Sequence, residues 1–199
     1  MSASYLETVA PEAASGPVRE MYDADVATLG YVTTDSFLFS LRPGVHASWR
    51  ALVKTIRKTM RLRPYELVTL AAAQALGCRA CVSAHGALLL RNGVVDRAQL
   101  EAIVRDFRNA GLEPLEVAMM DLAENVAIDA HRVTPADIET LRTLGLADAE
   151  ILDVVLAAAA RSFYSKTLEA LGVPPCPELV ETNHLLDMVG CEAIVSRAC

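Results

Sequence analysis

An all-helical fold is predicted by the composition, by the spacing of the apolar residues and by the lack of alternating strand patterns. Of the 199 residues, 53% are hydrophobic and only 5% are aromatic, with abundant Ala and Leu, a composition that favours helix packing over strand pairing. Apolar residues recur at helical spacing, as at Val45, Trp49, Leu52 and Ile56. A chain of this length can bury a core without a disulfide or a metal.

Proline, glycine and capping residues divide the sequence into expected helices. An amphipathic helix should end at Gly30, and the next stretch should divide at Pro43 and Gly44. Pro64 is placed in the first turn of the following helix, and Glu66 with it. The expected helices span 18–30, 45–63, 64–76, 78–91, 96–110, 113–129, 134–144, 147–171 and 178–197. We treat 1–199 as one domain with N-terminal helices (1–63), a helical hairpin (64–93) and C-terminal helices (94–199).

Charge and hydropathy exclude several partners. The net charge of −7 and the pI near 5.1 oppose attraction to nucleic acid or to an anionic membrane. The N-terminus lacks the pattern of a secretory signal, and no apolar run is long enough to cross a bilayer. We therefore expect a cytoplasmic protein. Its apolar composition would expose hydrophobic surface in a monomer, which predicts a homo-oligomer.

Cys78, Cys81 and His85 carry the main chemical signal. Separations of three and four residues place their side chains along one stripe of the expected helix 78–91, whose N-terminus holds the two cysteines. The unpaired N–H groups at a helix N-terminus and a nearby imidazolium both lower a thiol pKa. Two cysteines three residues apart can also close a disulfide, which resolves a sulfenic acid before over-oxidation.

Glu66 is the expected partner of His85. If residues 64–76 and 78–91 form an antiparallel hairpin about Gly77, the two residues lie about 16 Å and about 12 Å from the turn, at 1.5 Å per residue. A Glu–His–Cys relay would orient the imidazole and let it take the thiol proton. Glu66 would also complement the helix dipole at its N-terminal turn, and the two roles are compatible.

The same residues also allow other interpretations. Free cysteines often serve as small buried hydrophobes, and His85 would then be a core or interface histidine. A zinc site lacks a fourth ligand, and a haem attachment motif requires His where Val82 stands. The other three cysteines match no motif and are expected to be unpaired thiols, and the other histidines are expected at surface, capping or packing positions. These residues are Cys176, Cys191, Cys199, His46, His131 and His184.

Two further patterns stand outside this group. A basic cluster is expected to form a solvated helix face or, alternatively, a patch for an anionic substrate or partner; its members are Lys54, Arg57, Lys58, Arg61 and Arg63. The segment starting at Glu150 also repeats the acidic and apolar positions of the segment starting at Glu66. It has Ser162 and Ser165 at the cysteine positions and Glu169 at that of His85, so helix 147–171 is interpreted as a degenerate, structural repeat.

The motif E66-x(11)-C78-x-x-C81-x-x-x-H85 resembles that of the AhpD-like alkylhydroperoxidases and carboxymuconolactone decarboxylases, in particular their peroxidase-related branch. The flanks ASGPVREMYDADVATLGYV, FSLRPGVHASWRAL and TPADIETLRTLGLADAEILDVVLAAA are also similar, so the resemblance covers most of 8–174. It implies an all-α AhpD-like fold, a homo-oligomer, no metal or organic cofactor and reduction by an external dithiol protein. It also implies that Cys81 is the peroxidatic thiol, Cys78 the resolving thiol, His85 the proton acceptor and Glu66 its support.

The sequence departs from the family pattern between the cysteines. Alkylhydroperoxidases often carry a histidine there, whereas this chain has Arg79 and Ala80, and an Arg79 side chain points away from Cys78 on the helix. The expected function is a thiol-dependent hydroperoxide reductase. The alternatives are a general thiol–disulfide oxidoreductase, a redox-sensing oligomer and, less favoured, a carboxymuconolactone decarboxylase-like lyase. Neither the peroxide, the reductant nor the oligomer symmetry follows from the sequence.

Overall fold

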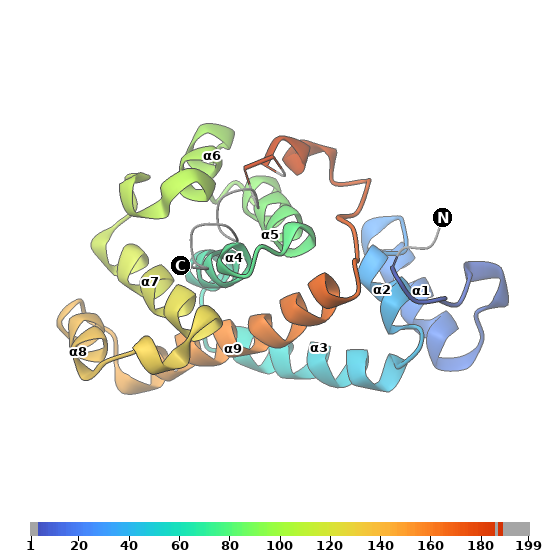
Figure 1. Ribbon diagram of the computed structural model, residues 1–199, viewed down its shortest axis with the longest axis horizontal. Coiled ribbons are helices and arrows are strands. Elements are labelled where there is room, and N and C mark those ends of the chain that lie inside the picture. Colours follow the sequence, from blue (N-terminus) through green and yellow to red (C-terminus); the bar gives the residue numbers. More distant parts are fainter. Residues whose placement is uncertain (1–3, 186, 189–199) are drawn as a thin grey trace.

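The computed structural model describes residues 4–185, 187 and 188, and within them all the regular structure is helical (Figure 1). The α-helices are α1 (Gly16–Leu29), α2 (Thr34–Phe39), α3 (Pro43–Arg57), α4 (Leu62–Ala75), α5 (Arg79–Arg91), α6 (Arg97–Asp106), α7 (Pro114–Ile128), α8 (Pro135–Thr143) and α9 (Asp148–Ala170). Four short 3₁₀ helices are η1 (Pro11–Ala13), η2 (Phe107–Asn109), η3 (Ala130–Arg132) and η4 (Val180–Leu185). The predicted all-α fold class is confirmed.

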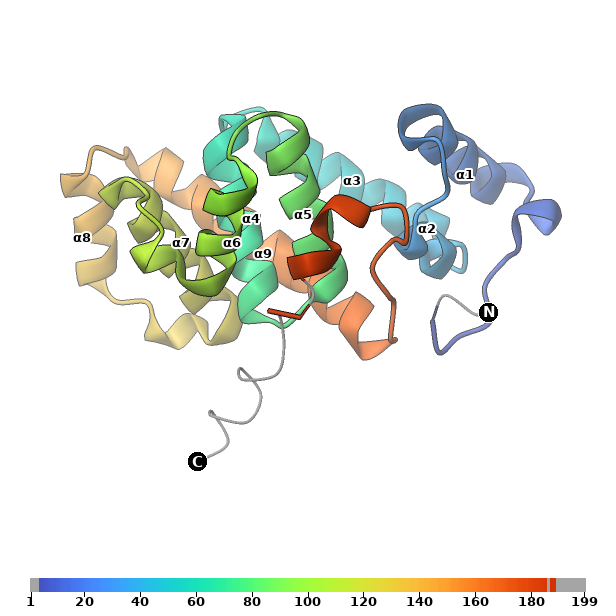
Figure 2. The same ribbon diagram turned by 90° about the horizontal axis from the view of Figure 1, so that it is seen from above.

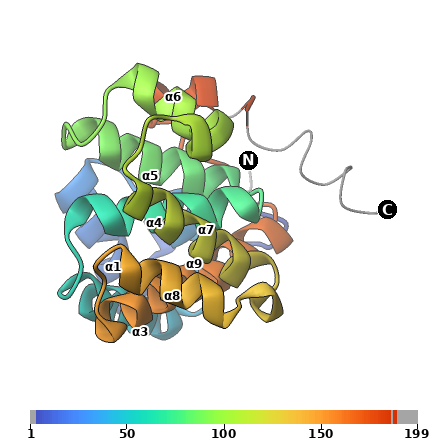
Figure 3. The same ribbon diagram turned by 90° about the vertical axis from the view of Figure 1, so that its left-hand side faces the viewer.

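Helix α4 lies at the centre of the molecule, where it packs against α5, α7 and α9 (Figures 1 and 3). Its side chains are buried around the whole helix from Tyr65 to Ala73, as expected of a helix without a solvent face. The run Ala71–Ala73 is fully or almost fully buried, and such small side chains allow neighbouring helices to approach closely. This central packing fixes the position of Glu66 in the core.

The α4–α5 connection forms the predicted hairpin. Gly77 adopts a left-handed conformation with φ of +67°, which costs a residue without a Cβ very little. Its N–H donates to the carbonyl of Gln74, and the N–H of Cys78 donates to that of Ala73. The chain thus reverses within a few residues, and Cys78 becomes the N-cap residue of α5.

Helices α3 and α9 lie side by side along one edge, while α1 and α2 occupy one end of the elongated molecule and α8 the other (Figures 1 and 2). The indole Nε1 of Trp49 in α3 donates to the carbonyl of Ala160 in α9 at 3.3 Å. None of the described helices is long and apolar enough to span a membrane.

Three expected details differ from the structure. Helix α4 begins at Leu62, so Glu66 lies one residue beyond the first turn and Pro64 is its third residue. The stretch before Pro43 contains the short helix α2, which Thr33 caps through its side chain. Of the helix expected at 178–197, the described residues show only the 3₁₀ segment Val180–Leu185, and residues 186 and 189–197 lie outside the described residues.

Candidate functional site

The four predicted site residues come together where α4 faces α5. Glu66 lies on α4, Cys81 and His85 on α5, and Cys78 at the start of α5. All four are buried. Glu66 Oε2 and His85 Nδ1 are 2.6 Å apart, so the predicted Glu–His contact is direct and needs no bridging water.

The Glu66 carboxylate sets the proton positions of His85. A carboxylate accepts hydrogen bonds only, so Nδ1 of the neutral ring carries the proton and Nε2 holds the free lone pair. The other carboxylate oxygen, Oε1, lies 3.8 Å from Arg57. Burial acts to raise the pKa of Glu66, but the charge and hydrogen bond of His85 and the charge of Arg57 outweigh it, and the pKa is lowered overall. Glu66 therefore stays ionised and leaves His85 Nε2 as a base.

Cys78 and Cys81 are both unpaired thiols in the described structure. A hydrogen bond from Cys78 is the largest influence that lowers the pKa of Cys81, which falls to about 5 although burial opposes the shift. The same contact, with burial, raises the pKa of Cys78. One proton is therefore shared unequally, with Cys81 as the thiolate and Cys78 as the thiol that stabilises it.

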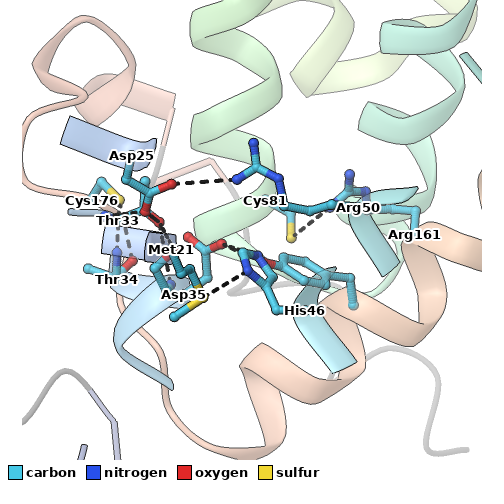
Figure 4. A network of polar contacts seen from close by, with 12 residues as sticks. Met21, Asp25, Thr33, Thr34, Asp35, His46, Arg50, Cys81, Arg161 and Cys176 are labelled. Atoms are coloured by element: carbon cyan, nitrogen blue, oxygen red, sulfur yellow. Dashed lines mark hydrogen bonds and ion pairs between the residues drawn. The ribbon is translucent and has the colours of Figure 1, made fainter. Parts of the chain in front are cut away.

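Arg161 is the cation beside Cys81, and the sequence reasoning missed it. Arg161 lies on α9, and its Nη1 donates to Cys81 Sγ at a distance of 3.6 Å (Figure 4). The guanidinium is buried and lies 5.4 Å from the Trp49 ring centroid and 5.6 Å from that of Tyr164, within cation–π range. Arg79, the cation between the cysteines in sequence, is exposed.

The interpretation of α9 as purely structural does not hold for this end of the helix. Arg161 donates to Cys81, while Ser165 lies close enough to Cys81, and Glu169 close enough to Cys78, to influence the pKa values of this site. A signal for Arg161 was present in the sequence. Val154, Ala157, Ala158 and Leu168 form a buried stripe on α9, and Arg161 stands on it as the one cation at helical spacing. A cation on an apolar stripe must find a partner in the core.

Cys81, His85 and Arg161 all line one cavity of about 250 Å³. Its apolar wall comes from Leu29, Ala84, Ala87, Leu88, Leu168 and Leu179, among other residues. A hydrogen-bonded group lies on another side: the Tyr164 hydroxyl donates to Asp35 and lies 3.2 Å from His46 Nε2. The cavity is thus a mainly apolar chamber whose wall carries the thiolate, the base and Arg161, with Asp35, Arg50 and Arg91 as its other charged residues.

His46 and Cys176 also lie on this wall. His46 is buried and packs on Phe39, in agreement with the expected packing role, and burial lowers its pKa. Cys176 is unpaired and buried, and it accepts from the Thr34 N–H at 3.3 Å; burial raises its pKa. Cys191 and Cys199 lie outside the described residues. No group of three or more His, Cys, Asp or Glu side chains within the described part of the chain is arranged to hold a metal ion.

Comparison with known proteins identifies the segment that carries this site. The model of the carboxymuconolactone decarboxylase family matches residues 43–125. These residues belong to that family. No curated protein matches the chain. The family segment contains Glu66, Cys78, Cys81 and His85, whereas Arg161 on α9 lies beyond its end.

Solved structures share the fold of this chain. An AhpD-core peroxidase-related protein from Ralstonia eutropha JMP134 superposes with a TM-score of 0.81 at 22% identity, over 90% of this chain and 95% of the other. A peroxidase-related protein from Silicibacter sp. TM1040 gives 0.80 at 19% identity, over the same shares. The debrominase Bmp8, solved as a cysteine-to-alanine variant with 2,3,4-tribromopyrrole, gives 0.74 at 13% identity, over 93% and 97%. The fold is therefore AhpD-like.

Proposed function

We propose that the chain is a thiol-dependent hydroperoxide reductase in which Cys81 attacks the peroxide and Cys78 resolves the product. The observation that carries this proposal is the placement of Cys81 between the Cys78 thiol and the Arg161 guanidinium on the wall of an apolar cavity that also holds His85. Nucleophile, resolving thiol, base and cation are thereby within one site. A low thiol pKa in a partly apolar pocket is typical of reactive cysteines.

In the first step the Cys81 thiolate attacks the terminal oxygen of the hydroperoxide. The S–O bond forms as the O–O bond breaks, which oxidises Cys81 to a sulfenic acid and reduces the peroxide to an alcohol. The leaving alkoxide needs a proton. His85 Nε2 takes a proton when the thiolate forms and returns it to the alkoxide, while Glu66 stabilises the imidazolium meanwhile.

In the second step Cys78 attacks the Cys81 sulfenic acid. The S–S bond forms and the S–O bond breaks, and the Cys78 proton leaves with the hydroxide as water. The interaction between the two thiols that lowers the pKa of Cys81 also supports this step, because the attacking and receiving sulfur atoms must lie close together for it. An external dithiol protein then reduces the disulfide by exchange and regenerates both thiols.

The test is peroxide consumption by pre-reduced protein, followed by mass mapping of its cysteines. Wild type should consume about one equivalent of peroxide without added reductant and acquire a Cys78–Cys81 disulfide. Cys81→Ser should lose the reaction, and Cys78→Ser should stop at a sulfenic acid that a dione reagent traps. Cys176→Ser is the matched control, because Cys176 lines the same cavity outside the pair. Unchanged consumption by Cys81→Ser would overturn the proposal.

A general thiol–disulfide oxidoreductase is the alternative within the same chemistry. Both functions use the Cys78–Cys81 disulfide, so they differ in the oxidant. A protein that exchanges rapidly with small disulfides but ignores hydrogen peroxide and organic hydroperoxides would support the oxidoreductase. Slow stoichiometric oxidation without turnover by any dithiol would instead support a redox sensor.

Reductive debromination is a second candidate reaction for the same thiols. The cavity has aromatic walls, since Trp49 and Tyr164 line it and stack with ring centroids 3.7 Å apart, and Bmp8 shares the fold. In this reaction an aryl bromide and two thiols give the arene, hydrogen bromide and a disulfide. Bromide release from tribromopyrrole by pre-reduced protein, absent in Cys81→Ser, would support it.

A further inference from the structure

We propose that the substrate is an organic hydroperoxide that carries a carboxylate, and that the carboxylate binds in a basic groove formed mainly by α3 at the entrance to the cavity. This inference rests on the proposed peroxidase function and specifies its substrate class. The groove has a volume of about 710 Å³. Its charged lining consists of Arg50, Lys54, Arg57, Lys58 and Arg161, with Glu66 as the one acid.

The sign of this groove is opposite to that of the whole chain. The protein carries a net charge of −7, so a general attraction to anions is absent and the positive field is local. Arg50, Lys54 and Arg57 lie at helical spacing on α3, and Lys58 is its C-cap residue. This spacing places their charges along one stripe. A concave surface lined by charges of one sign concentrates ligands of the opposite sign.

The cations of the groove differ in whether they already lie near a carboxylate of the protein. Arg50 pairs with Asp25 at 3.5 Å, and Arg57 lies 3.8 Å from Glu66. Lys54 and Lys58 form no ion pair with any described carboxylate, and their chains are long enough to follow a bound anion. They are therefore the two side chains that an incoming carboxylate would neutralise.

The groove and the thiol cavity are adjacent. They share the lining residues Trp49, Arg50, His85, Leu88 and Arg161. Arg161 is buried, and its Nε has no hydrogen-bond partner among the described residues, which is costly for a guanidinium unless a ligand supplies an acceptor. The positive path thus runs from the α3 stripe to the atom beside Cys81.

A substrate that occupies both the cavity and the groove needs a different chemical group at each end. The inner cavity is walled mainly by apolar side chains and holds the thiolate, whereas the outer groove is basic. A volume of about 250 Å³ holds on the order of eight methylene-sized groups, at roughly 30 Å³ for a water-sized volume. An acyl chain of about this length fits the inner cavity. With a hydroperoxide at one end and a carboxylate at the other, it would meet the thiolate inside the cavity and the cations of the groove outside it.

The experiment compares 8-hydroperoxyoctanoic acid with its methyl ester, which has the same hydroperoxide without the charge. The second-order rate constant of Cys81 oxidation is measured in a single turnover of pre-reduced full-length protein, with no reductant present. At low salt we expect the acid to react about tenfold faster than the ester, within the range of electrostatic steering. Added salt should reduce this ratio.

Two charge-matched double variants locate the effect. Lys54→Gln/Lys58→Gln should bring the acid-to-ester ratio close to one and leave the ester rate within about twofold of wild type. Lys166→Gln/Arg132→Gln removes the same charge from exposed positions outside both cavities and should keep the wild-type ratio. Thermal unfolding of each variant confirms that it is folded.

The outcomes separate this inference from the proposed function. Equal rates for acid and ester in wild type would overturn the carboxylate site while leaving the peroxidase intact. Absence of Cys81 oxidation by either compound would overturn the peroxidase itself. If the double lysine variant keeps the wild-type ratio and loses only turnover with an acidic dithiol protein, the groove serves that protein and the substrate inference is wrong.

Discussion

At the scale of single residues, the pKa of the Cys81 thiol is set by opposing effects. Burial of a thiolate is costly, and an apolar cavity would normally keep the thiol protonated. The Cys78 hydrogen bond, the Arg161 charge and the Ser165 hydroxyl together exceed that cost. Arg161 is itself held by aromatic faces and by the thiolate, so the two buried charges support each other. Removing either leaves the other uncompensated.

The thiolate should therefore be measurable directly. Ultraviolet thiolate absorbance of the reduced protein, taken as the difference from Cys81→Ser, should show a transition near pH 5. Cys78→Ala should move the transition upwards most, because its hydrogen bond is the largest influence, and Arg161→Gln should also move it upwards. Arg161→Lys restores the charge and should return part of the shift. A transition that stays near pH 5 in Arg161→Gln would contradict the role of the guanidinium.

Glu66 is expected to link stability to pH as well as to support His85. Its pKa is lowered in the folded protein, so the unfolded state binds more protons between the two pKa values and the free energy of unfolding rises with pH there. The stabilisation is present above about pH 4.5 and is lost as pH falls through the folded pKa.

Glu66→Gln should flatten this acid limb in urea unfolding measured from pH 6 to pH 3. It should also slow Cys81 oxidation by about tenfold or more, because a neutral amide no longer fixes the His85 proton and supports an imidazolium. Glu113→Gln, an exposed acid at the N-cap of α7, is the control and should retain the peroxide rate. A wild-type rate in Glu66→Gln would remove Glu66 from the mechanism.

At the scale of elements, the turn at Gly77 determines where the thiols lie. Its left-handed φ of +67° ends α4 and lets α5 begin at once. A Cβ at this position would meet no atom within 4 Å, so the cost of a side chain is conformational rather than steric. That cost is about 1 kcal/mol for a residue other than glycine.

Gly77→Ala should lower the free energy of unfolding by about 1 kcal/mol in urea titrations. Gly30→Ala is the matched variant, because Gly30 caps α1 with φ of +88° and also has no atom near its Cβ position. Both variants should lose similar stability, but only Gly77→Ala should change the Cys81 thiolate transition. An identical transition in both would mean that the turn does not position the cysteines.

At the scale of the whole molecule, the exposed apolar residues supply the reason to expect an oligomer. Leu152, Leu156 and Phe163 follow one stripe of α9 and are 55%, 41% and 48% exposed. Val45 and Leu52 on neighbouring α3 are also exposed. Large exposed apolar residues grouped on one helix face often mark an interface. Oligomerisation stays a prediction, and this α9 stripe is the surface on which we place it.

Leu152→Glu/Leu156→Glu should shift the protein to a smaller species in sedimentation velocity, because two carboxylates would be buried without partners in the interface. Val26→Glu, at an exposed position of α1, should leave the sedimentation coefficient unchanged. Helical circular dichroism checks that the monomer is folded. A wild-type protein that sediments as a monomer at all concentrations would refute the prediction.

Local sequence signals were enough to predict the helices and the central residues of the site. Caps, prolines and glycines placed most helix boundaries close to those observed, because these signals are local. Cys78, Cys81 and His85 were found because they share one helix, and Glu66 because a hairpin of known rise brings it level with His85. Contacts within one helix, or between two helices joined by a short turn, can be predicted from residue spacing alone.

The surroundings of the thiols, in contrast, depend on how distant helices pack. Arg161 lies 80 residues from Cys81 in the chain, and no local periodicity states which helix α9 will face. The same holds for the basic cluster, whose members separate in the fold: Lys54, Arg57 and Lys58 line the groove, while Arg63 pairs with Glu116 in α7. The sequence shows which residues are charged, but the partner of each charged residue depends on helix packing, which arises from long-range contacts.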